Sequence, residues 1–221
     1  VPMMERDHAS LAAERVLSEL ERADPSRVIV ALRASGGEVE KLVSWVDSFD
    51  LEATILWCSA PRLESYLAEN GLGGEAGKGR DVWLALGLAA ESEYVVVHDA
   101  DATTYSATHV RRLLYPLTEG KEFVKGYYAR VENDRLYGRL FRIFFTPLVR
   151  ALRDRQDASL LQYLDSFRYA LAGEFAAKGS VVADLRMPRG WGLEVATLGG
   201  AFDAAGFEGT AQVDLGVHKH D

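Results

Sequence analysis

Two aspartates separated by one residue, Asp99 and Asp101, are the strongest chemical signal in the chain. They follow residues 94–98, a hydrophobic run typical of a buried strand, and an α/β sheet presents its ligands where such strands end. Carboxylate oxygens suit Mg²⁺ or Mn²⁺, and either ion would bridge this pair to a diphosphate. The simpler interpretation is a pair of solvated loop aspartates, because the Asp-x-Asp triplet alone is common.

A glycine-rich segment, Gly77-Lys78-Gly79-Arg80, lies one helix earlier in the chain. Glycines let the backbone approach an anion closely, the helix that follows offers free N–H groups, and Lys78 adds a positive charge. The segment is not a P-loop, because Gly79 stands where that motif requires serine or threonine. An ordinary flexible loop before a helix is the competing interpretation.

Three further polar segments are candidates for a site. In His218-Lys219-His220, a histidine could give a ring nitrogen to the metal that Asp101 holds. Glu194 begins a predicted helix and could bind sugar hydroxyls, while Arg139 and Arg142, one helical turn apart, could clamp a phosphate. Each has a simpler interpretation, which is respectively a solvated tail, an acid favoured by the helix dipole, and a solvated basic face.

Hydrophobic periodicity predicts the elements that must position these residues. Strands are expected at 28–32, 53–57, 94–98 and 122–128, alternating with helices at 8–22, 39–49, 61–70, 80–91 and 106–118. Beyond residue 130 the pattern predicts helices at 136–154, 158–169, 173–179 and 193–206, with one late strand at 210–215. This order predicts a single α/β domain over residues 1–221, with a mostly parallel sheet, helices on both faces and a helical C-terminal portion.

Composition narrows the class of protein. The chain has 221 residues, of which 48% are hydrophobic, so it can bury one sizeable core. It contains neither a transmembrane run nor an apolar stretch typical of a signal peptide, and its single cysteine agrees with a reducing cytosol. We therefore expect a cytoplasmic protein without a transmembrane segment. The formal charge of −8 argues against nucleic acid as a partner. The first and last residues suggest that both ends are trimmed relative to the gene product.

Taken in order, these segments resemble one family, the glucosyl-3-phosphoglycerate synthases and the related mannosyl-3-phosphoglycerate synthases, which are retaining GT-A glycosyltransferases. The resemblance covers nearly the whole chain. Residues 1–5 are similar to the family's "IPALNEE" turn, 77–83 to "GKGEALW", 95–101 to its Asp-x-Asp strand and 123–128 to "LVKSFYRR". Later matches are 138–149 to "GRVTELVARPLL", 171–176 to "LSGEYA", 190–194 to "GYGVE" and 211–220 to "AQVNLGVRAH".

The resemblance implies a Rossmann-like GT-A domain, with a nucleotide-sugar-binding half at 1–130 and an acceptor-binding half at 131–221. It implies metal-dependent transfer of a hexose from UDP-glucose or GDP-mannose to a small, anionic hydroxyl acceptor such as a phosphoglycerate-like compound, with retention. A homodimer is left open. The product would then be a compatible solute.

Site residues follow from the same resemblance. Asp101 and His220 are expected to hold Mg²⁺ or Mn²⁺, and Asp101, Glu194 and Lys78 are the expected catalytic residues. Together the metal and Lys78 would neutralise the leaving diphosphate. Contacts to the nucleotide sugar are expected from Pro2, Glu5, Ser35, Gly77, Lys78, Asp99, Ala100, Leu171 and Gly173, and contacts to the acceptor from Gly138, Arg139 and Phe141.

Three departures from the family pattern concern the nucleotide base and the acceptor. Phe141 replaces a threonine that helps to hold the acceptor phosphate, so we expect 3-phosphoglycerate to be a poor acceptor. Arg33-Ala34-Ser35 replaces an acidic-serine turn that contacts the nucleotide. The chain also stops at Asp221, one residue short of an asparagine expected to contact the acceptor.

Two other functions share part of this pattern. An inverting GT-A transferase acting on a lipid-linked or polymeric acceptor would also carry Asp-x-Asp, but it usually needs an apolar membrane-facing element that the sequence lacks. A non-catalytic paralogue that binds nucleotide sugars is the other, and the presence of Asp99, Asp101 and His220 argues against it.

Overall fold

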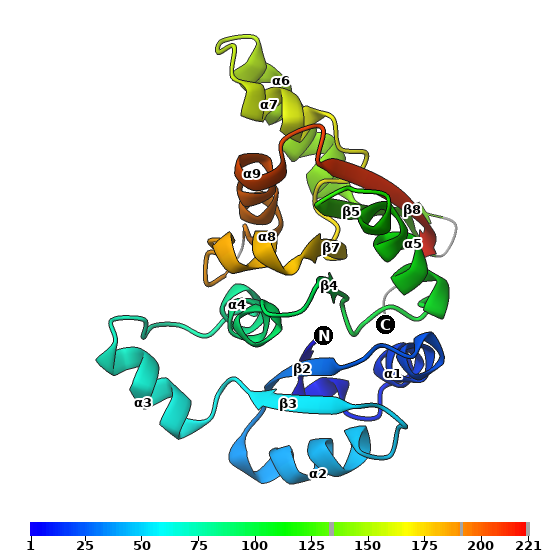
Figure 1. Cartoon of the computed structure of the whole chain (residues 1–221), viewed down its shortest axis with the longest axis vertical. Coiled ribbons are helices and arrows are strands. Elements are labelled where there is room, and N and C mark those ends of the chain that lie inside the picture. The colour runs from blue at the N-terminus through cyan, green and yellow to red at the C-terminus, as the bar shows by residue number, and fades with distance from the viewer. Residues whose placement is uncertain (133–134, 191, 220–221) are drawn as a thin grey trace.

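The computed structural model describes residues 1–132, 135–190 and 192–219 and contains two sheets (Figure 1). The first sheet is parallel and has the order β1 (Pro2–Met4), β2 (Val28–Arg33) and β3 (Ala53–Trp57). Strand β2 is central and its apolar residues are mostly buried, as expected for a parallel strand covered on both faces. The associated helices are α1 (Leu11–Ala23), α2 (Gly36–Val46) and α3 (Pro61–Glu69).

The second sheet contains β4 (Tyr94–Val97), β7 (Phe175–Lys178) and β5 (Phe123–Glu132) in that order, with β8 (Thr210–His218) beside β5. Strand β7 runs antiparallel to both β4 and β5, so β4, β5 and β8 share one direction. The short β6 (Arg135–Leu136) folds back on the end of β5. The predicted α/β class with a mostly parallel sheet is confirmed.

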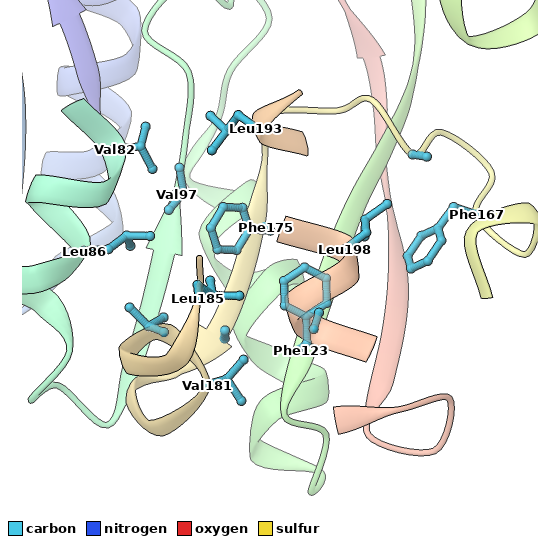
Figure 2. Close-up of a cluster of buried hydrophobic side chains, with 14 of the residues drawn as sticks. Val82, Leu86, Val97, Phe123, Phe167, Phe175, Val181, Leu185, Leu193 and Leu198 are labelled. Carbon is cyan, nitrogen blue, oxygen red and sulfur yellow. The ribbon is translucent and has the colours of Figure 1, made fainter. Parts of the chain in front are cut away.

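Helices cover the second sheet and separate it from solvent. They are α4 (Lys78–Ala89), α5 (Ala107–Thr118), α8 (Gly179–Asp184) and α9 (Leu193–Ala205). Side chains from α4, α8 and α9 gather over β4, β7 and β5 (Figure 2). Within this core the rings of Phe123 and Phe175 stack with their centroids 5.6 Å apart. This packing holds β4 and β7 in place. It thereby positions the residues that follow β4 and those that precede β7, where the candidate site lies.

The sequence-based prediction of a helix at 173–179 is wrong. Residues 175–178 form β7, and α8 begins only at Gly179. The segment Phe-Ala-Ala-Lys is consistent with helical periodicity, but here it lies between two strand edges and bonds to both. Pairing on both sides outweighs the weak helix propensity of four residues.

The predicted helix at 136–154 is interrupted. Residues 135–136 form β6, residues Leu140–Phe145 form a π-helical turn, and α6 (Thr146–Arg153) follows. The N–H of Thr146 bonds to the carbonyl of Phe141, five residues back. Pro147 lacks an N–H and cannot continue the regular ladder, which favours such a turn. Helix α7 (Ser159–Asp165) is also shorter than the predicted 158–169.

Strand β8 extends beyond the predicted 210–215 through a bulge. Gly216 has a φ of +86°, a conformation that favours glycine, and its N–H bonds to Asp214 Oδ1 at 2.8 Å. The pairing with β5 shifts register at this point and then continues to His218 opposite Arg130. The extended strand brings Lys219 to the loop that follows β4, where Thr103 N–H donates to the Lys219 carbonyl oxygen.

Candidate functional site

Lys78 and Asp99, which come from different motifs, meet at the end of β4. The Nζ atom of Lys78 lies 2.6 Å from Asp99 Oδ1. Burial opposes the charge on Lys78, but Asp99 and the nearby carboxylates of Glu194 and Glu174 outweigh it, so the pKa of Lys78 is raised. The site therefore keeps a permanent cation where β4 ends.

Glu194 brings the C-terminal half of the chain to the same place. It lies in the first turn of α9, and its Oε1 is 3.9 Å from Lys78 Nζ. Its side chain is 24% exposed and that of Lys78 is 41% exposed. Both groups can therefore reach a ligand that enters from solvent.

The turn Leu171–Gly173 packs against the side chain of Asp99. A Cβ added at Gly173 would overlap the Asp99 carboxylate, so glycine is needed for this close approach. Ala172 is completely buried. The predicted contact residues Leu171 and Gly173 thus lie beside Asp99, and their binding of a nucleotide sugar stays a prediction.

Gly173→Ala is expected to displace the Asp99 carboxylate and to lower the rate of any reaction at this site at least tenfold, which is about 1.4 kcal/mol. Gly199→Ala in α9 is the matched control, because a Cβ there meets nothing within 4 Å. The control should keep full activity and gain a little stability, since alanine is the better helix former. Steady-state kinetics and thermal unfolding of both variants test this. Equal activity of the two would show that Asp99 does not depend on Gly173.

The glycine-rich loop before α4 has a packing role. A Cβ at Gly77 or Gly79 would overlap the backbone carbonyl of Arg189 or Pro188, and Arg80 N–H donates to Arg189 O at 3.1 Å. The glycines therefore seat the start of α4 against the loop that precedes α9. Contact of Gly77 with a nucleotide stays a prediction.

The metal prediction falls partly outside the described residues. Asp101 is exposed just after the buried Ala100, whereas His220 lies outside the described ranges. Lys219 is tied to the loop after Asp101, because Thr103 N–H donates to Lys219 O at 2.9 Å and Lys219 N–H donates to Thr104 Oγ1 at 3.2 Å. Within residues 1–132, 135–190 and 192–219, no group of three His, Cys, Asp or Glu could hold a metal. The carboxylate of Asp101 is a hard oxygen donor of the kind that Mg²⁺ and Mn²⁺ prefer, and metal binding by Asp101 and His220 stays a prediction.

His218 points into the protein. It is 2% exposed, and its ring stacks on Tyr128 with centroids 4.1 Å apart. Its Nε2 atom lies 4.0 Å from Glu174 Oε1. Of the His-Lys-His segment, His218 is thus a packing residue in this structure.

The nucleotide-side residues lie at the ends of β1 and β2. Ser35 N–H donates to Glu5 Oε2 at 2.9 Å, which lowers the pKa of Glu5 and joins the two predicted contact residues. Pro2 pairs with Ala31 in the same sheet. Glu5 and Ser35 follow β1 and β2 and so lie at the carboxyl edge expected for a nucleotide site, whereas Pro2 begins β1.

The predicted acceptor residues lie at the start of the π-helical turn. Gly138 has a φ of +86° and Arg139 is exposed. Arg142 Nη2 donates to Leu136 O at 3.0 Å, so this arginine is engaged with the backbone. Clamping of a phosphate by Arg139 and Arg142 stays a prediction.

Known proteins resemble this chain over its whole length. A curated glucosyl-3-phosphoglycerate synthase from Methanococcoides burtonii is 34% identical over 233 residues, covering 100% of this chain and 58% of the relative. Another from Persephonella marina is 39% identical over 209 residues, covering 88% of this chain and 52% of the relative. The chain is a homologue of the glucosyl-3-phosphoglycerate synthases. It spans about half the length of these two relatives. No family model matches it.

The fold agrees with this homology. A crystal structure of glucosyl-3-phosphoglycerate synthase from Mycobacterium tuberculosis, in complex with Mn²⁺, UDP-glucose and phosphoglyceric acid, superposes with a TM-score of 0.74 at 26% identity. The match covers 100% of this chain and 69% of that chain. The GT-A type of the fold is thereby confirmed. In the described part of the chain, no helix is both long and apolar enough to cross a membrane.

Arg33, one departure from the glucosyl-3-phosphoglycerate synthase pattern, has a partner of its own. Its Nε donates to Asp81 Oδ2 at 2.8 Å. Burial raises the pKa of Asp81 in spite of the opposing arginine. Arg80, in the first turn of α4, donates to Glu64 Oε1 at 2.7 Å. Basic residues at these two positions are thus compensated by acids from α4 and α3.

Sequence reasoning missed Lys125 and Glu174 as parts of this region. Both are 1% exposed, and both contribute to the charge balance around Lys78. They lie inside residues 123–128 and 171–176, two of the segments on which the family resemblance rests. The sequence does not show that these two charged side chains are buried. A correct prediction of a strand at 175–178 would have placed Glu174 next to the sheet and so indicated its burial.

Proposed function

We propose that this protein is a metal-dependent hexosyltransferase that uses a nucleotide sugar, with UDP-glucose as donor and a phosphoglycerate-like compound as acceptor. The observation that carries the proposal is the cluster of Lys78, Asp99 and Glu194 at the end of β4. The Mn²⁺, UDP-glucose and phosphoglyceric acid bound by the Mycobacterium tuberculosis relative support it. GDP-mannose remains the alternative donor.

The residues have distinct roles in the proposed reaction. Asp101 and His220 would hold Mg²⁺ or Mn²⁺, which supplies positive charge to the leaving diphosphate. Lys78 adds a second positive charge, fixed in place by Asp99 before the donor arrives. Asp99 would contact the ribose or a metal-bound water, and Glu194 would bind sugar hydroxyls. The bond from the anomeric carbon to the phosphate oxygen would break while the acceptor oxygen bonds to the same face of that carbon, and the hydroxyl proton would pass to the departing diphosphate, so the configuration is retained.

Calorimetry with UDP-glucose and GDP-mannose, each with and without Mn²⁺, tests the donor side. We expect Mn²⁺-dependent binding, tighter for UDP-glucose. Mass spectrometry of mixtures with 3-phosphoglycerate and related hydroxy acids identifies the acceptor, and the anomeric coupling constant of the product reports retention. Absence of metal-dependent binding for both donors would refute the proposal.

Phe141 is expected to make 3-phosphoglycerate a poor acceptor. Its ring packs against Tyr169, edge to face at 5.2 Å, and on Phe145, stacked at 5.8 Å, so it offers no hydroxyl to a phosphate. A hydrogen bond to a charged group contributes about 1.5–3 kcal/mol, or roughly tenfold to a hundredfold in affinity. Phe141→Thr should lower the KM for 3-phosphoglycerate by this factor, while losing some stability with the aromatic contacts.

Tyr115→Thr is the control for this change, because Tyr115 is an aromatic residue on α5, outside the predicted acceptor residues, and is 65% exposed. Its KM for 3-phosphoglycerate should stay as in wild type. Wild-type transfer to 3-phosphoglycerate at ordinary millimolar KM or better would show that other groups replace the threonine.

We also propose a homodimer formed through an apolar stripe on the π-helical turn and α6. The stripe consists of Leu136, Leu140, Ile143, Phe144, Leu148 and Leu152, each between 39% and 69% exposed. Helices α6 and α7 project from one end of the molecule (Figure 1). A second copy turned by 180° would bring the two stripes together and remove the apolar residues of both from solvent.

Analytical ultracentrifugation tests the dimer. Phe144→Asp and Leu148→Asp should shift the protein to monomer, whereas Tyr66→Asp, at an exposed aromatic residue on α3, should not. A wild-type protein that stays monomeric at tens of micromolar would contradict the proposal.

A further inference from the structure

Two buried ionisable side chains lie next to the Lys78–Asp99 pair without a role in the proposed reaction. Lys125 belongs to β5, and Glu174 directly precedes β7. Each is 1% exposed. Charged side chains are rarely buried this completely unless they are paired or hydrogen-bonded, because they lose their solvation. Their burial here requires an explanation.

Lys125 connects β5 to the turn that supports Asp99. Its Nζ atom donates to the carbonyl oxygen of Ala172 at 2.6 Å, inside the protein. The next residue, Gly173, lies directly against the Asp99 carboxylate. The ammonium group of Lys125 is therefore linked through two residues of backbone to Asp99.

The charge of Lys125 is balanced by acids of the same region. Burial lowers the pKa of Lys125 to about 8, whereas the carboxylates of Glu194 and Glu174 favour its charged form. Neither carboxylate oxygen of Glu174 has a hydrogen-bond partner among the described residues. Burial and the nearby Asp99 raise the pKa of Glu174 to about 8, and Lys78 and Lys125 are the cations that oppose this rise.

We propose that Lys125 is a positioning residue of the donor site. It holds the Ala172 carbonyl, so that Gly173 keeps the Asp99 carboxylate beside Lys78, and its charge offsets that of Glu194. The inference rests on the proposed function, because it takes Asp99 and Lys78 to be donor-binding groups. Its consequence is specific: loss of Lys125 weakens donor binding and leaves acceptor binding unchanged.

Lys125→Met tests this by keeping the length of the side chain while removing its charge and its hydrogen bond. Lys178→Met is the matched control, since Lys178 is on the neighbouring β7 and partly exposed, with Nζ 3.6 Å from Glu122. Calorimetry with UDP-glucose and Mn²⁺, together with the KM values for UDP-glucose and 3-phosphoglycerate, gives the readout. The donor Kd and KM should rise about tenfold or more for Lys125→Met. The acceptor KM should stay within about twofold, and the control should match wild type.

A second variant keeps the test decisive if Lys125→Met fails to fold. Lys125→Met/Glu174→Gln replaces both buried ionisable groups with neutral ones, so no buried carboxyl group is left to ionise and the thermal midpoint should lie above that of the single variant. Its donor Kd should remain high, because the Ala172 carbonyl still lacks the ammonium group. Wild-type donor affinity in either variant, or an equal rise of both KM values, would overturn the inference while the proposed function stands. A wild-type protein that binds no donor would overturn both.

Discussion

Asp101→Ala should lower kcat/KM for hexosyl transfer by about a thousandfold or more, which is about 4 kcal/mol of lost transition-state stabilisation. The side chain is exposed at the end of β4, close to the segment that carries residue 219. In the proposed function it supplies an anionic oxygen to the metal, and the leaving diphosphate would lose that positive charge. Activity measured across a Mn²⁺ titration should not recover at high metal concentration.

The fold should survive this substitution, because an exposed side chain leaves no cavity when it is truncated. Asp203→Ala, at an exposed aspartate of α9, is the control and should keep wild-type activity. Thermal unfolding of both variants should stay close to that of wild type. If purified Asp101→Ala retains most of its activity, the metal assignment is wrong.

Lys78→Met should lower kcat/KM for the donor by roughly a hundredfold to a thousandfold, or about 3–4 kcal/mol, the range for losing one preorganised donor to a developing charge. The substitution removes the ammonium group of Lys78, whose Nζ lies 2.6 Å from Asp99 Oδ1 and 3.9 Å from Glu194 Oε1. Both carboxylates then lose their neighbouring positive charge. A diphosphate would then enter a site dominated by carboxylates. Binding and catalysis should both suffer.

Lys41→Met provides the comparison, since Lys41 is an exposed lysine in α2 with its own carboxylate, Glu38, at 2.8 Å. Exposed pairs of this kind contribute little, so this variant should be indistinguishable from wild type. Lys78→Arg should recover part of the activity, because it keeps the charge but not its position. If Lys78→Met lowers kcat/KM by less than about tenfold, groups other than Lys78 stabilise the leaving diphosphate.

Much of the first half of the fold could be predicted from local pattern. The runs at 28–32 and 94–98 are apolar enough to be buried strands, and the structure places β2 and β4 there. Prediction fails where the structure depends on distant partners. Residues 175–178 become a strand only because β4 and β5 offer free edges on both sides, and no window of the sequence shows those edges.

The same division holds for the site. Asp99 and Lys78 carry motif signals, and their contact follows from the meeting of a strand end and a helix start. Lys125 and Glu174 carry no motif that separates a buried charge from an exposed one. Their importance depends on burial, which is a property of the assembled sheet.

The insertion of β7 between β4 and β5 also constrains how the protein can assemble. Strands β4 and β5 follow each other in the chain but never pair, so the second sheet cannot close until residues 175–178 reach the gap between them. About eighty residues separate the partners Val97 and Phe175, and such distant pairing is entropically costly and slows folding. During synthesis from the N-terminus, β1 to β3 can pair first, whereas β4 and β5 wait with unpaired edges. Substitutions in β7 should therefore slow folding and promote aggregation, even where they leave the finished site untouched.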